Sequence, residues 1–471
     1  MRTPTAKGGF FASLRQIRGA TLIAAAGAGL ALYLLVLSLG DGTGADQLKT
    51  WALLVLAISL FATHVLPEHV TALTVFLLAL LGDIAPADVV FSGFEVGALW
   101  LLFSGIIIGA AAQEAGLGAF IARRILSLWR MTYTRAVVLL IVIALVLGLI
   151  VPATIPRIIL LMPVALGLAE AMGFEEGGKG YTGLALAAGL GTFLPTFAVV
   201  TANLPAVVHV GVIESVYGIK VSYAEFLIYQ LPAVGILRAV VLMALLLLLF
   251  SQPGQPVTET SRERMTLRQF RLSIVLFGAI IFWATDVFHG IHPAWIAMAA
   301  AVVILWPSSR LISPTAFREK IDLAPVLYVA SLLSIGAIMI NNGLDAELGD
   351  FILGFVSFSP DSQLINLYLL TVLSQLVCLI STTPAAPILL VPIAGELGQA
   401  SEIPLMGVLM AQLVGFSSAL LPYQAPPLIV LLSLCKVRFR DVVKVIMLVA
   451  LATLFLGVPV AYLWWGSLGL L

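Results

Sequence analysis

The chain has 471 residues, of which 61% are hydrophobic and only 10% are charged, and its formal net charge at pH 7 is zero. Soluble globular proteins carry about 25% charged residues, so this composition excludes an ordinary water-soluble domain. The zero net charge also gives no reason to expect a nucleic acid as a partner.

Hydrophobic stretches near the length that crosses a bilayer as a helix follow one another along the chain. They are continuous rather than alternating, so they predict helices and not a β-barrel. The first follows basic residues but lacks a convincing cleavage site, so we expect it to be a retained span and not a signal peptide. The sequence predicts eleven spanning helices, near residues 20–40, 50–66, 67–82, 96–115, 182–208, 224–250, 270–286, 291–307, 323–342, 404–434 and 443–468.

Two further apolar stretches, 136–170 and 365–396, are each interrupted by a polar segment that contains proline. The interruptions read Val-Pro-Ala-Thr-Ile-Pro-Arg at 151–157 and Ser-Thr-Thr-Pro-Ala-Ala-Pro at 381–387. Each arm has about 14 residues, roughly 21 Å of helix, against a hydrocarbon core of about 30 Å. We therefore expect two re-entrant hairpins, with two proline-kinked spans as the alternative.

The basic residues fit this scheme. With a cytoplasmic N-terminus, nearly all Lys and Arg fall in cytoplasmic segments, and only Lys49 and Lys220 lie on the opposite side. This is the bias that the positive-inside rule requires, and counting either hairpin as a full span would destroy it. The prediction is a multi-pass protein of the inner (plasma) membrane, with its N-terminus cytoplasmic and its C-terminus external.

The two halves of the chain share an order of elements. Residues 99–126 and 326–353 each contain a span, then Gly-Leu at Gly116 and Gly343, then an amphipathic stretch. A hairpin and a span broken by Gly and Pro follow in each half, at 182–208 and 404–434. An odd number of crossings separates equivalent elements, so the repeats should be inverted, as in many secondary transporters. The predicted organisation is a first repeat at 1–250, a cytoplasmic linker at 251–270 and a second repeat at 271–471.

A helix that begins inside the membrane directs unpaired N–H groups into a cavity, which favours an anion. Arg157 begins such a helix without a nearby acid in sequence, and a guanidinium at membrane depth needs a partner. We expect that partner to be a substrate anion; alternatively, Arg157 braces the hairpin by bonding backbone carbonyls. Arg238 could simply extend to the interface, with a role in substrate binding as the alternative. The candidate substrate-binding residues are Thr154, Arg157, Asn203, Thr382 and Thr383.

Breaks rich in Gly and Pro also free carbonyl oxygens, the ligands that sodium prefers. The candidate ion-binding residues are Ala153, Gly191, Thr192, Thr201, Ser417 and Ser418. No cofactor is expected apart from Na+ as a candidate coupling ion. The sequence shows neither a phosphate-binding glycine loop nor a nucleophile–base pair, and its five histidines lack metal-ligand spacing, so we expect no enzyme activity.

The Gly-Leu pairs, hairpins, broken spans and basic loops resemble the divalent anion:sodium symporter family of the ion-transporter superfamily over nearly the whole chain. The resemblance implies a homodimer with a scaffold domain and a transport domain that moves as an elevator. It also implies dicarboxylate, citrate or sulfate as substrate, driven by sodium or by exchange. The family's Ser-Asn-Thr tips are replaced by Ala153-Thr154-Ile155 and Thr382-Thr383-Pro384. The first tip looks more like the Pro-Ser-Asn-Thr-Ala-Arg form of the citrate and oxoglutarate–malate exchangers.

The sequence thus predicts an all-α polytopic membrane protein with about 11 transmembrane helices and two re-entrant hairpins in two inverted repeats. Its predicted function is secondary active transport of a small anion across the bilayer, by cation symport or anion exchange with alternating access. The alternatives are an efflux carrier of the same superfamily for an oxyanion or other cargo, and a membrane enzyme or assembly factor.

Overall fold

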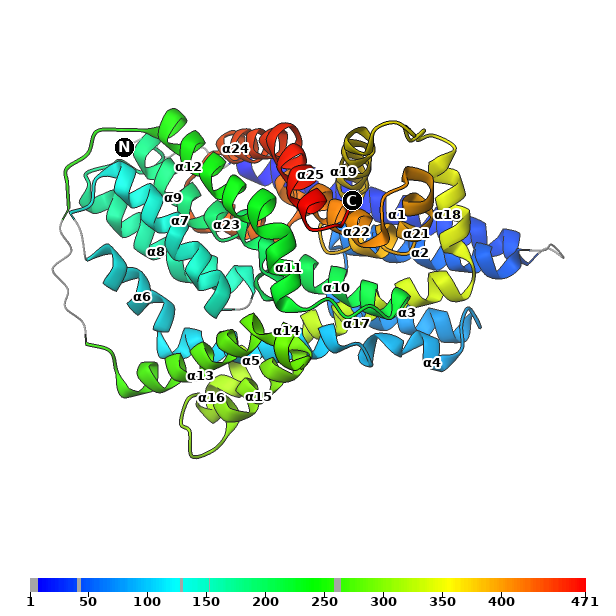
Figure 1. Ribbon diagram of the computed structural model, residues 1–471, viewed down its shortest axis with the longest axis horizontal. Helices are drawn as coiled ribbons and strands as arrows, with labels where there is room; N and C mark the ends of the chain where they lie inside the picture. Colours follow the sequence, from blue (N-terminus) through cyan, green and yellow to red (C-terminus); the bar gives the residue numbers. More distant parts are fainter. Residues whose placement is uncertain (1–6, 40–43, 128–129, 152, 258–263) are drawn as a thin grey trace. The chain divides into compact units, whose positions relative to one another are not determined.

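The computed structural model describes residues 7–39, 44–127, 130–151, 153–257 and 264–471 (Figure 1). Regular secondary structure in these ranges is helical, with one isolated bridge between Met131 and Val257. Pro152 of the first tip, Arg2 and Arg262 lie outside the described residues. The chain divides into unit 1, Met1–Glu95 with Leu323–Phe351, and unit 2, Val96–Asp322 with Ile352–Leu471. Each unit takes residues from both predicted repeats, so the repeat boundaries stay a prediction.

Unit 1 contains two pairs of packed helices, α1 against α2 and α17 against α3. Its elements are α1 (Lys7–Ser38), α2 (Ala45–Thr63), α3 (Glu68–Leu81), α4 (Ala87–Val90), the 3-10 turn η1 (Ser92–Phe94), α17 (Ala324–Asn341) and most of α18 (Leu344–Leu353).

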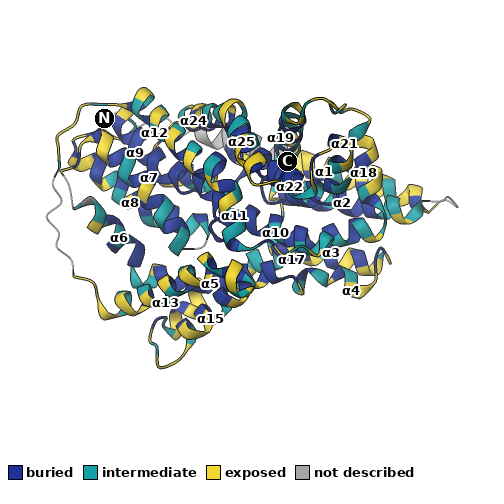
Figure 2. Ribbon diagram, viewed as in Figure 1, coloured by how far each residue is buried: buried dark blue, intermediate teal, exposed yellow. Residues whose placement is uncertain are grey.

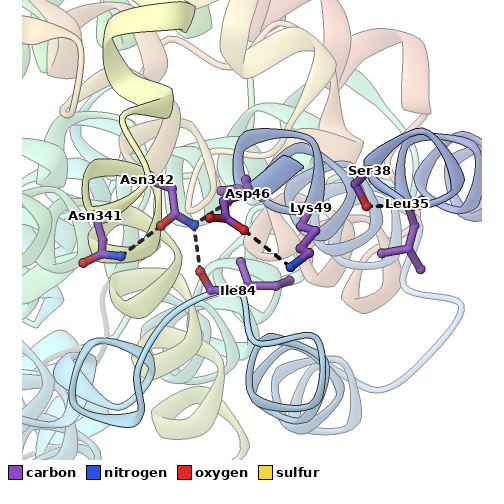
Figure 3. A network of polar contacts seen from close by, with 8 residues as sticks. Leu35, Ser38, Asp46, Lys49, Ile84, Asn341 and Asn342 are labelled. Atoms are coloured by element: carbon purple, nitrogen blue, oxygen red, sulfur yellow. Dashed lines mark hydrogen bonds and ion pairs between the residues drawn. The ribbon is translucent and has the colours of Figure 1, made fainter. Parts of the chain in front are cut away.

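Asn342, at the end of α17, connects three segments of unit 1 (Figure 3). Its side-chain amide donates to Thr50 Oγ1 in α2 at 2.6 Å and to the Ile84 carbonyl oxygen before α4 at 2.9 Å. Asn341 Nδ2 donates in turn to Asn342 Oδ1 at 2.9 Å. An unpaired carbonyl is costly at membrane depth, so this amide stabilises the junction of the three segments.

Unit 2 is built around α9, which is buried along its length and packs against α7, α8 and α12 (Figures 1 and 2). Small residues make this approach possible: a Cβ added at Gly183 would lie 2.0 Å from the Tyr133 hydroxyl oxygen of α7 and 2.9 Å from Phe250 Cβ of α12. The elements of unit 2 are α5 (Gly97–Ala115), α6 (Leu117–Leu126), α7 (Tyr133–Ile150), α8 (Thr154–Ala171), α9 (Lys179–Gly191), η2 (Pro195–Ala198), η3 (Val200–Ala202), α10 (Leu204–Tyr217), α11 (Tyr223–Gln230), the π-helix η4 (Leu231–Ile236), α12 (Leu237–Phe250), α13 (Leu267–Ala284), α14 (Asp286–His289), α15 (Pro293–Leu305), α16 (Pro314–Lys320), α19 (Gln363–Ile380), α20 (Ala386–Leu390), α21 (Ala394–Ser401), α22 (Leu405–Phe416), η5 (Pro422–Gln424), α23 (Pro426–Leu434), α24 (Phe439–Ala452), the π-helix η6 (Thr453–Gly457) and α25 (Val458–Ser467).

Eleven helices among the described residues are long and apolar enough to cross a membrane, the number that the sequence predicts, but they are not the same eleven. The prediction of 14-residue hairpin arms is wrong: α7, α8 and α19 have 18 residues each. Each is roughly 27 Å long and could cross the core by length alone. The helices α7 and α19 are longer at the ends away from the tips, where they begin at Tyr133 and Gln363, and α8 begins within the polar interruption, at Thr154. Conversely, α3, α15 and the pair α22 and α23 are shorter than the spans predicted there.

The two Gly-Leu pairs form the same local structure. Gly116 ends α5 with φ of 64° and Gly343 follows α17 with φ of 68°, both in the left-handed region. A helix of 10 residues, α6 or α18, begins at the following leucine. Glycine adopts this backbone conformation without a Cβ clash, so the chain turns from a long helix into a short one at both places.

Candidate functional site

The first hairpin consists of α7 and α8, joined by the tip at 151–153. Thr132 caps α7, accepting a hydrogen bond from the Arg135 backbone N–H at 3.4 Å. Ala153 precedes α8 with φ of 73° and ψ of 131°, a conformation that is rare for any residue except glycine. Its side chain provides no cap, so the first N–H groups of α8 are available to water or a ligand.

Arg157 lies in the first turns of α8 and is fully buried. No acidic side chain among the described residues is within ion-pair distance of it. Its guanidinium instead donates to neutral oxygens of the tip and of the break that follows α9. These acceptors are the carbonyl oxygens of Val151 at 3.3 Å, Thr192 at 3.0 Å and Ala202 at 2.9 Å, and Oγ1 of Thr154 at 3.4 Å and of Thr196 at 3.3 Å.

Thr154 and Asn203 complete this group. The Thr154 hydroxyl donates to the Asn203 side-chain carbonyl oxygen, and Asn203 Nδ2 donates to Thr196 Oγ1 at 3.0 Å. The structure therefore brings together three predicted substrate-binding residues, Thr154, Arg157 and Asn203, with Thr192 of the predicted ion-binding set. We call Arg157 and its five acceptor residues the first arginine cluster.

The second hairpin consists of α19 and the shorter α20, joined at 381–385. The backbone N–H and the hydroxyl of Thr383 both donate to the Gln424 carbonyl oxygen, at 2.9 Å and 3.0 Å. Thr382 is 2% exposed, and its hydroxyl has no hydrogen-bond partner among the described residues. No hydrogen bond between described residues joins this tip to the first arginine cluster.

Ser417 and Ser418, predicted to bind an ion, lie where α22 ends and are bonded to Arg238 of α12. The Arg238 guanidinium donates to both hydroxyls, to the carbonyl oxygens of Val414 and Ser417, and to Thr453 Oγ1. The distances are 2.9 Å to Ser417 Oγ, 2.7 Å to Ser418 Oγ, 3.0 Å to Val414 O, 3.3 Å to Ser417 O and 3.1 Å to Thr453 Oγ1. We call this group the second arginine cluster.

Three more residues of the predicted ion-binding set are buried near the first break without forming one ligand set. Thr201 lies in the 3-10 turn η3 and is 5% exposed. Gly191 ends α9 against α7, where an added Cβ would lie 3.3 Å from Ile141 Cγ1. The Thr192 hydroxyl donates to the Gly189 carbonyl oxygen at 2.8 Å, so only the Thr192 carbonyl reaches Arg157.

Sequence reasoning missed Arg238, Thr196 and Thr453. Arg238 does not extend to the interface but is 1% exposed. Its depth was a usable signal, because it lies about 18 Å of helix before the end of the 28-residue span Tyr223–Phe250. Such a position is too deep for the side chain to reach water along the helix. The two threonines carry no comparable signal, since Thr commonly bonds its own helix in a membrane.

Comparisons with known proteins agree with this architecture. A family model described as "Sodium:sulfate symporter transmembrane region" matches residues 21–471. A Cupriavidus necator protein described as "Membrane protein" is 22% identical over 348 residues, which cover 71% of this chain and 68% of that protein. The crystal structure of the Alcanivorax borkumensis YdaH transporter has a similar fold, with a TM-score of 0.55 and 15% identity, covering 84% of this chain and 89% of that one. The chain belongs to the sodium:sulfate symporter family and is a multi-pass membrane transporter of the secondary type, not an enzyme.

Proposed function

We propose that this protein carries a small anion, such as a dicarboxylate, citrate or sulfate, and binds it at the first hairpin tip. The observation that carries the proposal is Arg157, a fully buried guanidinium with no carboxylate partner among the described residues. Neutral oxygens accept hydrogen bonds from its two terminal nitrogens but leave its charge in place, and an isolated charge at this depth is costly. A bound anion would balance that charge.

Three features support binding at this place. Arg157 Nε makes no hydrogen bond within the described part of the chain, so one donor remains. The uncapped first turn of α8 adds backbone N–H groups and the positive end of the helix dipole. Thr154 and Asn203 provide neutral polar groups beside them. A carrier must release its anion after binding it. The residues at the first tip provide one full positive charge, that of Arg157, so they would bind the anion without holding it irreversibly.

The test is uptake of labelled succinate, citrate and sulfate into proteoliposomes that contain the full-length protein. We expect flux of at least one of these anions above that of protein-free vesicles. No flux of any of them, with or without a sodium gradient and with a counter-anion loaded inside, would contradict the proposal. Saturable outward flux alone would favour the efflux carrier.

Arg157→Ala tests the site itself. Charge-assisted hydrogen bonds contribute about 1.5–3 kcal/mol, so the Kd of the transported anion should rise about 10- to 100-fold. The matched control is Arg124→Ala, which removes an exposed arginine of α6 and should leave the Kd unchanged. An unaltered Kd in Arg157→Ala protein that elutes as a single folded species would assign Arg157 to bracing the hairpin alone.

A further inference from the structure

We propose that Arg157 and Arg238 are fixed cations that occupy the two places where the broken helices could otherwise bind coupling sodium ions. The inference rests on the proposed function and deepens it: the protein would carry its anion without sodium. It departs from the family description, which names sodium.

The two arginine clusters are built alike although the arginines come from non-equivalent helices. Each guanidinium donates to five oxygens, all of them neutral carbonyl or hydroxyl oxygens. Each reaches the carbonyl oxygen of the residue that caps a helix before a break, Thr192 after α9 and Ser417 after α22. The helices α9 and α22 are the predicted counterparts in the two repeats. At both breaks, therefore, an arginine donates to the carbonyl oxygen at the end of the broken helix.

The chemistry of these acceptors is that of a sodium site. Carbonyl oxygens at the C-terminal end of a broken helix carry the negative end of its dipole, and such oxygens coordinate Na+ in transporters with broken helices. Here the carbonyl oxygens of Thr192, Val414 and Ser417 accept N–H donors at hydrogen-bond distances. A sodium ion among them would contact a guanidinium directly, and two cations in contact repel each other strongly inside a protein.

The surroundings of Arg238 are unusual in a second, independent respect. The π-helix η4 ends at Ile236, two residues before Arg238, and the π-helix η6 begins at Thr453, which accepts from Arg238 Nε. A π-helical turn shifts the side chains that follow it around the helix axis, and such turns occur often at functional sites. Two of them meet at this arginine, and η4 contacts η6. This arrangement places the guanidinium at the end of α22 rather than toward lipid.

A fixed cation has a different consequence from a bound one. Its charge favours the anion in every conformation and never dissociates, so no sodium gradient can drive transport. Net transport must then be driven by the anion's own gradient or by exchange for a counter-anion. The charge of the empty carrier also differs, because an arginine stays positive when the substrate leaves.

The test uses thermal unfolding of the purified full-length protein in detergent, with sodium chloride compared with choline chloride at equal ionic strength. The wild type should show no sodium-specific shift of Tm. A saturable sodium-specific stabilisation of the wild type would overturn the inference. No anion substrate enters this measurement, so its result is readable whether or not an anion is carried.

Arg238→Ala and Arg157→Ala each vacate one cluster. Either variant should have a lower Tm than wild type and should gain a saturable response to Na+ or to millimolar guanidinium ion, of about 2 °C at ten times the Kd. The matched control is Thr453→Val, which removes one acceptor of Arg238 but keeps the guanidinium, and it should gain no response. Arg238→Lys keeps a charge and serves if the alanine variant does not fold; it should also remain insensitive to sodium. A purely bracing role predicts a lower Tm with no cation response in any variant, and that result would refute the inference.

Anion uptake separates this inference from the proposed function. Flux that is equal in sodium and in choline supports both. Flux that requires sodium supports the proposed function and refutes the inference that the two arginines replace sodium. Absence of flux with a sodium-insensitive Tm refutes the proposed function alone.

Discussion

Replacing Ala153 by glycine should stabilise the protein, although glycine usually destabilises. Ala153 has φ of 73° and ψ of 131° at the first hairpin tip. A non-glycine residue in such a region costs about 1–3 kcal/mol, and glycine removes most of this cost. Glycine also loses about 0.4–1 kcal/mol through the greater freedom of the unfolded chain. The free energy of unfolding should therefore rise by about 1 kcal/mol.

The assay is reversible unfolding of the purified protein in mixed micelles, followed by circular dichroism. The matched control is Ala165→Gly at a buried position inside α8, the helix that Ala153 precedes, and it should lose about 1 kcal/mol or more. Ala153→Gly that destabilises as much as Ala165→Gly would show that the tip does not hold this conformation. The reasoning from backbone geometry would then fail.

Three further predictions test the fold by the same unfolding measurement. Gly116→Ala and Gly343→Ala should each lower the free energy of unfolding by about 1–2 kcal/mol. An added Cβ would meet no atom within 4 Å, so the loss comes only from the left-handed backbone. A loss near zero would contradict the helix ends described here. Asn342→Ala should lower the free energy of unfolding by about 1–3 kcal/mol because it leaves the Ile84 carbonyl oxygen unpaired. The control Asn341→Ala should change it little. Equal losses in the two variants would rule out a stabilising role of Asn342 at this junction. A hydrogen bond to Glu68 raises the pKa of His64, in the turn after α2, above its ordinary value of 6.5. The stability that this pair contributes should therefore be fully present below pH 6.5 and should be lost as pH rises through the folded-state pKa of His64. The difference in unfolding midpoint between wild type and Glu68→Gln should shrink accordingly; a difference that grows with pH would reverse this assignment.

Local patterns predicted the secondary structure well because they act over a few residues. The interruption at 151–157 predicts the start of a helix, and α8 does begin within it, at Thr154. The Gly-Leu pairs likewise mark the ends of α5 and α17, where glycine tolerates the left-handed backbone. Arm length was misjudged because the helices extend past the hydrophobic stretches: α7 and α19 begin directly after the capping residues Thr132 and Ser362, and α8 begins within the polar interruption.

Burial was harder to predict than helix position. A hydrophobic residue in a membrane protein can face lipid or protein with equal ease, since both are apolar. Thus α9 is buried from Gly180 to Gly191, whereas Leu248 of α12 is 80% exposed, although both lie in apolar spans. The sequence alone offers only the small residues of α9 as a hint of close packing.

The sequence by itself determined the helical class, the positions of both hairpin tips and the presence of Arg157 at one of them. Hydrophobicity, proline and a charged residue within an apolar span are properties of short segments. Each constrains the local structure whichever segments pack against it. Only the tertiary structure decided what the two arginines bond. The acceptors of Arg157 include residues 35 to 45 positions away, and those of Arg238 lie 176 to 215 positions away. A buried charge must find oxygens wherever the packed chain brings them, and no spacing along the sequence records that choice.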